Sequence, residues 1–145
     1  AGAMRTVPMA EFILGPYHTA LEPGEVITAV RVPLPAPGTA IAHRKLAFHE
    51  RPAVTVTCLV SPRAGGGIAD ARVAVGSVGL TPMRLPGAEA VLREGAGAGD
   101  ALQRAAAEEC QPTADANGAV DYKRHLVGVL VRRAAADALA DCGIA

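Results

Sequence analysis

The sequence predicts an α+β fold, a short antiparallel sheet of three to four strands backed by about three helices, and three observations support it. Segments with the period-2 alternation of strands occupy the first half of the chain, and segments with helical periodicity follow them. A short glycine-rich loop joins two of the strand segments, and so short a connection cannot cross over to a parallel strand. Strands that precede helices in this way are typical of helices packed on one face of an antiparallel sheet.

The first strand is predicted in residues 24–33, where a Pro-Gly turn precedes alternating apolar residues. Val26, Thr28, Val30 and Val32 have the spacing of a strand with one buried face, and Pro33 ends the pattern. The next residues contain three prolines in the run PLPAPG, which is too many for a helix or a central strand. We therefore expect a domain boundary there, dividing the chain into residues 1–37 and 38–145.

Three further strands are predicted at residues 40–48, 54–61 and 69–78. The middle segment alternates strictly, and its apolar residues should all point into the core. The loop SPRAGGG follows it and predicts a hairpin, so that the last two segments pair antiparallel. The inward residues of the middle strand are expected to be Val54, Val56, Cys58 and Val60.

The remainder of the sequence predicts helices. The first begins at Pro86, the second at an N-cap formed by Asp100, and the third extends from about Val120 to Cys142 and is closed by Gly143. An apolar stripe on the third helix is expected to pack across the sheet. The stripe consists of Tyr122, Leu126, Val127, Val129, Leu130 and Val131.

The composition argues against a nucleic-acid or membrane protein. Fourteen basic and 14 acidic residues balance, and two Tyr, two Phe and no Trp leave little for stacking on bases. The apolar run LVGVLV is far shorter than the roughly 20 residues of a membrane helix, so we expect no membrane span and a cytoplasmic protein. Three widely spaced cysteines predict buried thiols, with neither a disulfide framework nor a metal site.

No catalytic or metal-binding residues are predicted. The four histidines lack the spacing of a metal site, and Ser61 and Ser77 lack the sequence context of a nucleophile. The run GSVGLTP lacks the spacing of a phosphate-binding loop, and we interpret it as a tight turn in which Gly76 and Gly79 relieve backbone crowding.

The loop within KLAFHERPAV is a candidate for binding. Lys45, His49, Glu50 and Arg51 cluster there between two predicted strands, and polar residues on a loop held by rigid strands are common at binding sites. A solvated hairpin tip has the same composition, so both interpretations remain open.

Three stretches, in this order, resemble one family. They are residues 5–33, with a Phe-x-x-Gly, a Thr-x-Leu and a Glu followed by two hydrophobic residues, the turn at 73–84, and residues 120–134 with Tyr-Lys-Arg and then Arg-Arg. The turn is similar to a Gly-Gly-x-Gly-x-x-Pro-x-Arg motif in which Ser77 replaces the second glycine. The family is the FAD-binding medium subunit of molybdenum hydroxylases, which includes aerobic carbon monoxide dehydrogenases and the flavin part of xanthine dehydrogenases.

The resemblance implies a division of the chain and two cofactor contacts. Residues 1–37 would be the terminal segment of an FAD-binding domain with its linker, and residues 38–145 a small C-terminal α+β domain. Ile27 and Lys45 match flavin-contacting positions of the family. Ile27 would act through its backbone and packing, and Lys45 through a donor to the polar edge of the ring. The two glycine-rich loops that hold the FAD pyrophosphate in the family are absent from this sequence.

The function implied is that of one part of an electron-transfer subunit. The chain would form one wall of the flavin site and part of a subunit interface, next to an FAD-binding N-terminal domain. The molybdenum cofactor and the [2Fe-2S] clusters would belong to partner subunits, a molybdenum-binding large subunit and an iron–sulfur small subunit. The alternative is a free-standing interaction or assembly module that kept the fold and no longer binds FAD.

Overall fold

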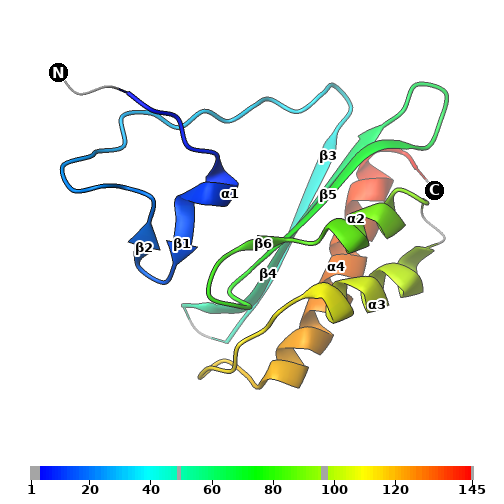
Figure 1. The fold of residues 1–145 in the computed structure, drawn as a ribbon. Helices are drawn as coiled ribbons and strands as arrows, with labels where there is room; N and C mark the ends of the chain where they lie inside the picture. Colours follow the sequence, from blue (N-terminus) through cyan, green and yellow to red (C-terminus); the bar gives the residue numbers. More distant parts are fainter. Residues whose placement is uncertain (1–3, 49, 96–97, 145) are drawn as a thin grey trace. The chain divides into compact units, whose positions relative to one another are not determined.

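The computed structural model describes residues 4–48, 50–95 and 98–144. The chain divides into two units, Ala1–Leu34 and Pro35–Ala145 (Figure 1). The first unit is small and holds three short elements, while the second contains a sheet and a helical layer. The elements of the first unit are α1 (Met9–Phe12), β1 (Ile13–Gly15) and β2 (His18–Thr19).

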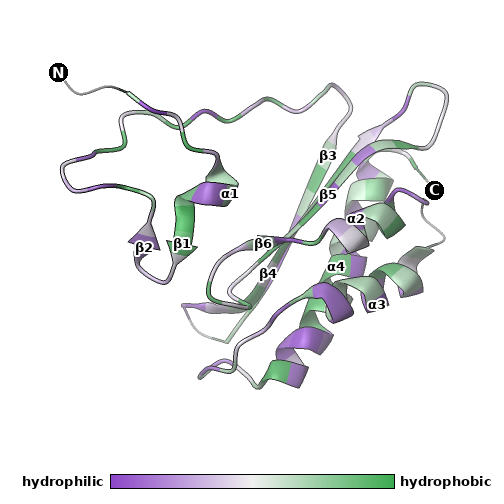
Figure 2. Cartoon of the chain, viewed as in Figure 1, coloured by the Kyte–Doolittle hydropathy of each residue, from purple (hydrophilic) through white to green (hydrophobic). Residues whose placement is uncertain are grey.

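In the first unit, from residue 4 onward, a two-stranded pair and an ion pair hold the chain together. β1 and β2 run antiparallel, and Figure 2 shows the first as hydrophobic and the second as hydrophilic. The guanidinium of Arg5 donates to both carboxylate oxygens of Glu25, at 2.7 and 2.6 Å. This hydrogen bond lowers the pKa of the Glu25 carboxyl to about 2.

The prediction of a strand in residues 24–33 is wrong, because this segment is irregular in the structure. Its alternating valines are exposed, and Val26 and Val30 retain 77% and 78% of their surface. A β-prone sequence becomes a strand only when a neighbouring strand satisfies its backbone groups. Among the described residues, no strand pairs with this segment.

The second unit contains the predicted antiparallel sheet. Its order is β3-β4-β5-β6, and every neighbouring pair is antiparallel. Val54, Val56, Cys58 and Val60 are all completely buried, which confirms the predicted inward face. The fourth strand was not predicted because it is only two residues long. The strands are β3 (Ala40–Ala47), β4 (Pro52–Pro62), β5 (Ile68–Gly76) and β6 (Met83–Arg84).

Three helices cover one face of this sheet, as predicted (Figure 1). α4 (Val120–Asp141) packs on β3 and β4, α2 (Pro86–Leu92) packs on β5, and α3 (Gly99–Glu109) bridges the other two helices. The buried core lies between the helices and the sheet. Gly143 has a φ of 69° and ends the long helix, as the sequence predicted.

The predicted N-cap of α3 is wrong by two residues. Ala98 occupies the cap position without a side-chain cap, and Asp100 lies inside the first turn. The carboxylate of Asp100 instead accepts a hydrogen bond from Arg132 on α4, at 2.7 Å. A charge pair with a neighbouring helix has therefore replaced the local cap.

The buried stripe of α4 differs from the predicted one at its start. Tyr122 is 40% exposed, whereas the next residue, Lys123, is only 1% exposed. From Lys123 the buried face continues through Val127 and Val131 at intervals of four residues. The buried face that contains Val127 and Val131 lies next to a partly exposed apolar strip that contains Tyr122 and Leu126. The sequence pattern alone did not separate the two.

The prediction of buried thiols is confirmed for two of the three cysteines. Cys58 and Cys110 are buried and Cys142 is half-buried. Burial raises the pKa of the Cys58 thiol to about 12, so this sulfur stays protonated and unreactive at neutral pH. None of the helices in the described part of the chain is long and apolar enough to cross a membrane.

Candidate functional site

Lys45 lies on the face of the sheet that the helices of this unit leave uncovered. Its neighbour Arg44 points to the other face, where it pairs with Asp137 of α4 at 2.6 Å. Successive side chains of a strand alternate between faces, so Lys45 projects away from the helices. We call this side of the sheet the open face. Its residues include Ile41, His43, Lys45, Thr55, Thr57, Leu59, Arg72, Ala74 and Gly76.

The open face is flat around Lys45 because its neighbours are small. Lys45 stands opposite Thr55, which in turn stands opposite Gly76 on β5. A Cβ atom at Gly76 would come within 2.7 Å of the hydroxyl of Thr55, so a larger residue there would have to displace the threonine side chain. Ala74 and Thr57 form the adjoining row. Small side chains on β4 and β5 leave room for a planar ring to lie against the sheet.

Lys45 is a cation at the β3 border of this flat surface. It is exposed and forms no ion pair with any other described residue. An ammonium group without an acidic partner is available to an external acceptor. A flat surface with a free donor at its border fits an aromatic ring with a polar edge, such as that of a flavin.

Lys123 of α4 holds the turn that follows β5. Its ammonium group lies 2.7 Å from the carboxylate of Asp115 and donates to the carbonyl of Ser77 at 3.4 Å. The hydrogen bond from Lys123 holds the pKa of the Asp115 carboxyl below its ordinary value. One buried cation thus connects the turn next to Gly76 with the loop that precedes α4.

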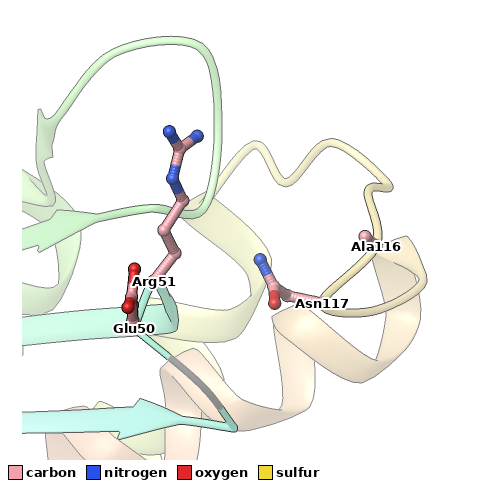
Figure 3. Close-up of a pocket in the computed structure, with 4 residues that line it drawn as sticks. All are labelled: Glu50, Arg51, Ala116 and Asn117. Carbon is pink, nitrogen blue, oxygen red and sulfur yellow. The ribbon is translucent and has the colours of Figure 1, made fainter.

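That loop borders a cleft with the β3–β4 hairpin. The cleft has a volume of about 520 Å³ and is lined by Glu50, Arg51, Ala116 and Asn117. Figure 3 shows Arg51 extending from the hairpin and the amide of Asn117 pointing into the space between the two loops. Of the predicted polar cluster in this hairpin, His49 lies outside the described residues. Glu50 and Arg51 do line a cleft, and Lys45 lies on β3 outside its lining.

Ile27 lies in the irregular segment of the first unit and is exposed. It follows Glu25, which Arg5 anchors, so the backbone before it is held in place. Ile27 and Lys45 belong to different units of the chain. Their roles as flavin contacts remain predictions.

The turn motif contains a strained residue where the family resemblance placed a glycine. Ser77 has a φ of 61°, in the left-handed region that disfavours side chains. Its side chain is exposed, so removing it costs no packing. Gly76 and Gly79 confirm the predicted crowding, because a Cβ at Gly79 would lie 2.7 Å from the carbonyl oxygen of Gln111.

We therefore expect Ser77→Gly to raise the free energy of unfolding by about 0.5 kcal/mol, since glycine adopts this conformation without strain. Leu80→Gly is the matched control in the same turn, because Leu80 is exposed and has an ordinary negative φ. It should lower stability by about 0.5–1 kcal/mol. Urea denaturation measures both, and a loss of stability in Ser77→Gly would contradict the strain argument.

Within the ranges that the structure describes, no three His, Cys, Asp or Glu side chains gather in a group that could hold a metal ion. The site around Lys45 offers a surface and a donor, which suit the positioning of a ligand. Sequence reasoning missed the supporting role of Lys123. The Tyr-Lys-Arg motif of residues 122–124 pointed to this position in the sequence, but it did not indicate that the lysine is buried.

Comparisons with known proteins agree with this architecture. Residues 40–138 match the family described as the CO dehydrogenase flavoprotein C-terminal domain. The chain is 37% identical over 142 residues to the carbon monoxide dehydrogenase medium chain of Hydrogenophaga pseudoflava, covering 95% of this chain and 50% of that one. It is 33% identical over 139 residues to the medium chain from Afipia carboxidovorans, covering 90% and 46%.

The structural comparison gives the same result. A carbon monoxide dehydrogenase from Hydrogenophaga pseudoflava, which lacks the Mo-pyranopterin moiety of the molybdenum cofactor, superposes with a TM-score of 0.86 at 36% identity, covering 95% of this chain and 50% of that one. The chain spans about half the length of the curated relatives it matches. The family match covers well over half of the chain, and the chain therefore belongs to the CO dehydrogenase flavoprotein C-terminal domain family.

Proposed function

We propose that this chain is part of the FAD-containing electron-transfer subunit of a molybdenum hydroxylase and forms one wall of its flavin site. The observation that carries the proposal is Lys45, an exposed cation without an acidic partner among the described residues, beside a flat patch of the open face. Membership of a flavoprotein domain family supplies the ligand class that this surface would take.

In this function the chain positions a cofactor and performs no covalent step. FAD, when bound, supplies the redox chemistry. Lys45 would donate a charge-assisted hydrogen bond to the polar edge of the ring and offset the negative charge that the ring gains on reduction. The small residues Thr55 and Gly76 would let the ring approach the sheet. Ile27 would contribute a backbone and packing contact to the flavin, as the family resemblance implies.

The two units have different places in this proposal. Residues 1–37 would end the FAD-binding domain, and residues 38–145 would form the C-terminal domain. The exposed apolar side chains of Val26, Val30 and Val32 support a further covering layer, because so many neighbouring apolar residues are rarely left in water. In the complete subunit, a region that corresponds to the unmatched half of these relatives would provide that layer.

The partners would be a molybdenum-binding large subunit and a small subunit that carries the [2Fe-2S] clusters. Two relatives are named as medium chains of carbon monoxide dehydrogenase, which supports a place in a multi-subunit enzyme. Mild affinity purification from the native host, followed by mass spectrometry and an absorption spectrum, tests this directly. Flavin bands with molybdenum and iron–sulfur partners are expected, whereas a colourless protein that elutes alone would exclude the proposal.

Lys45→Ala is expected to weaken FAD binding about tenfold in the complete flavoprotein, because a charge-assisted hydrogen bond contributes about 1.5 kcal/mol. Lys45 is exposed and unpaired within the described residues, so the melting temperature should stay within about 1 °C. FAD binding is measured by quenching of flavin fluorescence on the deflavinated protein.

The matched control for Lys45→Ala is Arg72→Gln. Arg72 is a second cation of the open face, but it lies two rows from Lys45, opposite Leu59. The Arg72→Gln substitution is therefore expected to leave FAD affinity unchanged. Equal affinities for wild type, Lys45→Ala and Arg72→Gln would remove Lys45 from the site.

A further inference from the structure

His43 shares the open face with Lys45 and is held in a fixed orientation. The two residues are two positions apart on β3, so their side chains leave the same side of the sheet, with Cα atoms about 7 Å apart. The Nδ1 atom of His43 lies 2.8 Å from the hydroxyl of Thr57 on β4. Because Nδ1 is engaged, Nε2 is the ring atom left for an external partner.

The other strands bring few charges to the surroundings of His43. β4 contributes the uncharged residues Thr55, Thr57 and Leu59. The cations of β5 and β6, Arg72 and Arg84, are already bound to acidic partners.

The acidic partners are Asp70 for Arg72 and Glu89 for Arg84. Lys45 has no acidic partner among the described residues and His43 keeps its Nε2 free, so these two residues of β3 offer polar groups to a ligand at one border of the flat patch.

We propose that His43 is a second flavin-positioning residue, whose Nε2 hydrogen-bonds the polar edge of the ring next to Lys45 and whose orientation is set by Thr57. This inference rests on the proposed function. It adds a residue that the family resemblance did not supply. Two polar groups on one rigid strand fix both the position and the rotation of a planar ring, which a single flexible lysine cannot do alone.

The test compares His43→Phe, which keeps a ring but has no polar atom, with His43→Gln, which keeps a hydrogen-bonding group. In the complete flavoprotein, His43→Phe is expected to weaken FAD binding about tenfold, while His43→Gln stays within about threefold of wild type. The midpoint potential of the bound flavin is expected to shift in His43→Phe and to return toward wild type in His43→Gln. A purely structural role would change the melting temperature and leave the potential unaltered.

Thr57→Val gives a second measurement that leaves His43 in place. It keeps the shape of the threonine and removes the hydroxyl that orients the imidazole, so FAD affinity should fall about threefold. Wild-type affinity and potential in both His43→Phe and Thr57→Val, with weakened binding in Lys45→Ala, would overturn the inference and leave the proposed function standing. Wild-type values in all three variants would overturn both.

Discussion

Glu89→Ala is expected to lower the free energy of unfolding by about 3 kcal/mol. Glu89 is only 5% exposed, and its carboxylate accepts a hydrogen bond from the backbone N–H of Val73 at 3.0 Å and another from Arg84. Val73 is completely buried, so alanine at position 89 would leave its N–H without an acceptor. A buried donor that loses its partner costs its full desolvation energy.

The position of Glu89 explains why one carboxylate has so large an effect. β6 pairs with β5 through Met83 and Arg84, so within the described ranges no strand lies beside the edge of β5 from Val73 back toward its start. The Leu85 N–H donates to the Val73 carbonyl, and Arg93 donates to the carbonyl of Ala71. Together with Glu89, these groups continue the hydrogen bonding of the sheet past the end of its last strand.

Urea denaturation measures the loss, with two variants for comparison. Glu89→Gln keeps an acceptor for the Val73 N–H and gives up the charge, so it should cost less, about 1 kcal/mol. Glu108→Ala is the matched control, because Glu108 is an exposed glutamate on α3. It should change stability by less than about 0.5 kcal/mol. Equal losses for Glu89→Ala and Glu108→Ala would show that the edge of β5 does not depend on Glu89.

Gly128→Val is expected to have a similar or larger effect, about 3 kcal/mol or more. Gly128 lies where α4 crosses α3, and a Cβ atom there would come within 2.7 Å of the carbonyl oxygen of Gln103. The obstacle is backbone, which cannot rotate away like the end of a side chain. The two helices would have to separate, and the buried contacts between them would loosen.

Gly128→Ala separates this clash from helix propensity. Alanine favours a helix over glycine by about 1 kcal/mol, so a purely local effect would stabilise the protein. We expect a net loss because the clash with Gln103 outweighs that gain. Gly99→Ala on α3 is the control, since its Cβ would meet only the Nε of Arg132 at 3.6 Å. Gly99→Ala should not lower the free energy of unfolding. A gain of stability in Gly128→Ala would contradict the close approach of α3 and α4.

The sequence predicted the sheet well because its signals are local. In β4 each apolar residue is separated from the next by one position, and a hairpin loop of glycines fixes the direction of β5. The alternation in residues 24–33 is equally regular, yet no strand formed there. The difference is the presence of a pairing strand, and a local pattern does not contain that information.

The residues with the strongest physical constraints were harder to predict. Glu89 and Lys123 resemble exposed charges in a helical pattern, and each is buried where a backbone partner outside its own helix meets it, the Val73 N–H in one case and the Ser77 carbonyl in the other. Lys45 was identified as a flavin contact through the family resemblance, because its place in the polar cluster with His49, Glu50 and Arg51 fits a solvated hairpin tip equally well. Its place on the open face became visible only with the register of the sheet.

The alternation of β4 has a consequence for how this protein can change. Neighbouring positions such as Val56 and Thr57 face two different surroundings, a sealed interior and an open surface. A substitution at the first would act mainly on folding, and under the proposed function a substitution at the second would act on the bound ring. Evolution can therefore retune the cofactor surface one residue at a time, while the interior that carries it stays the same.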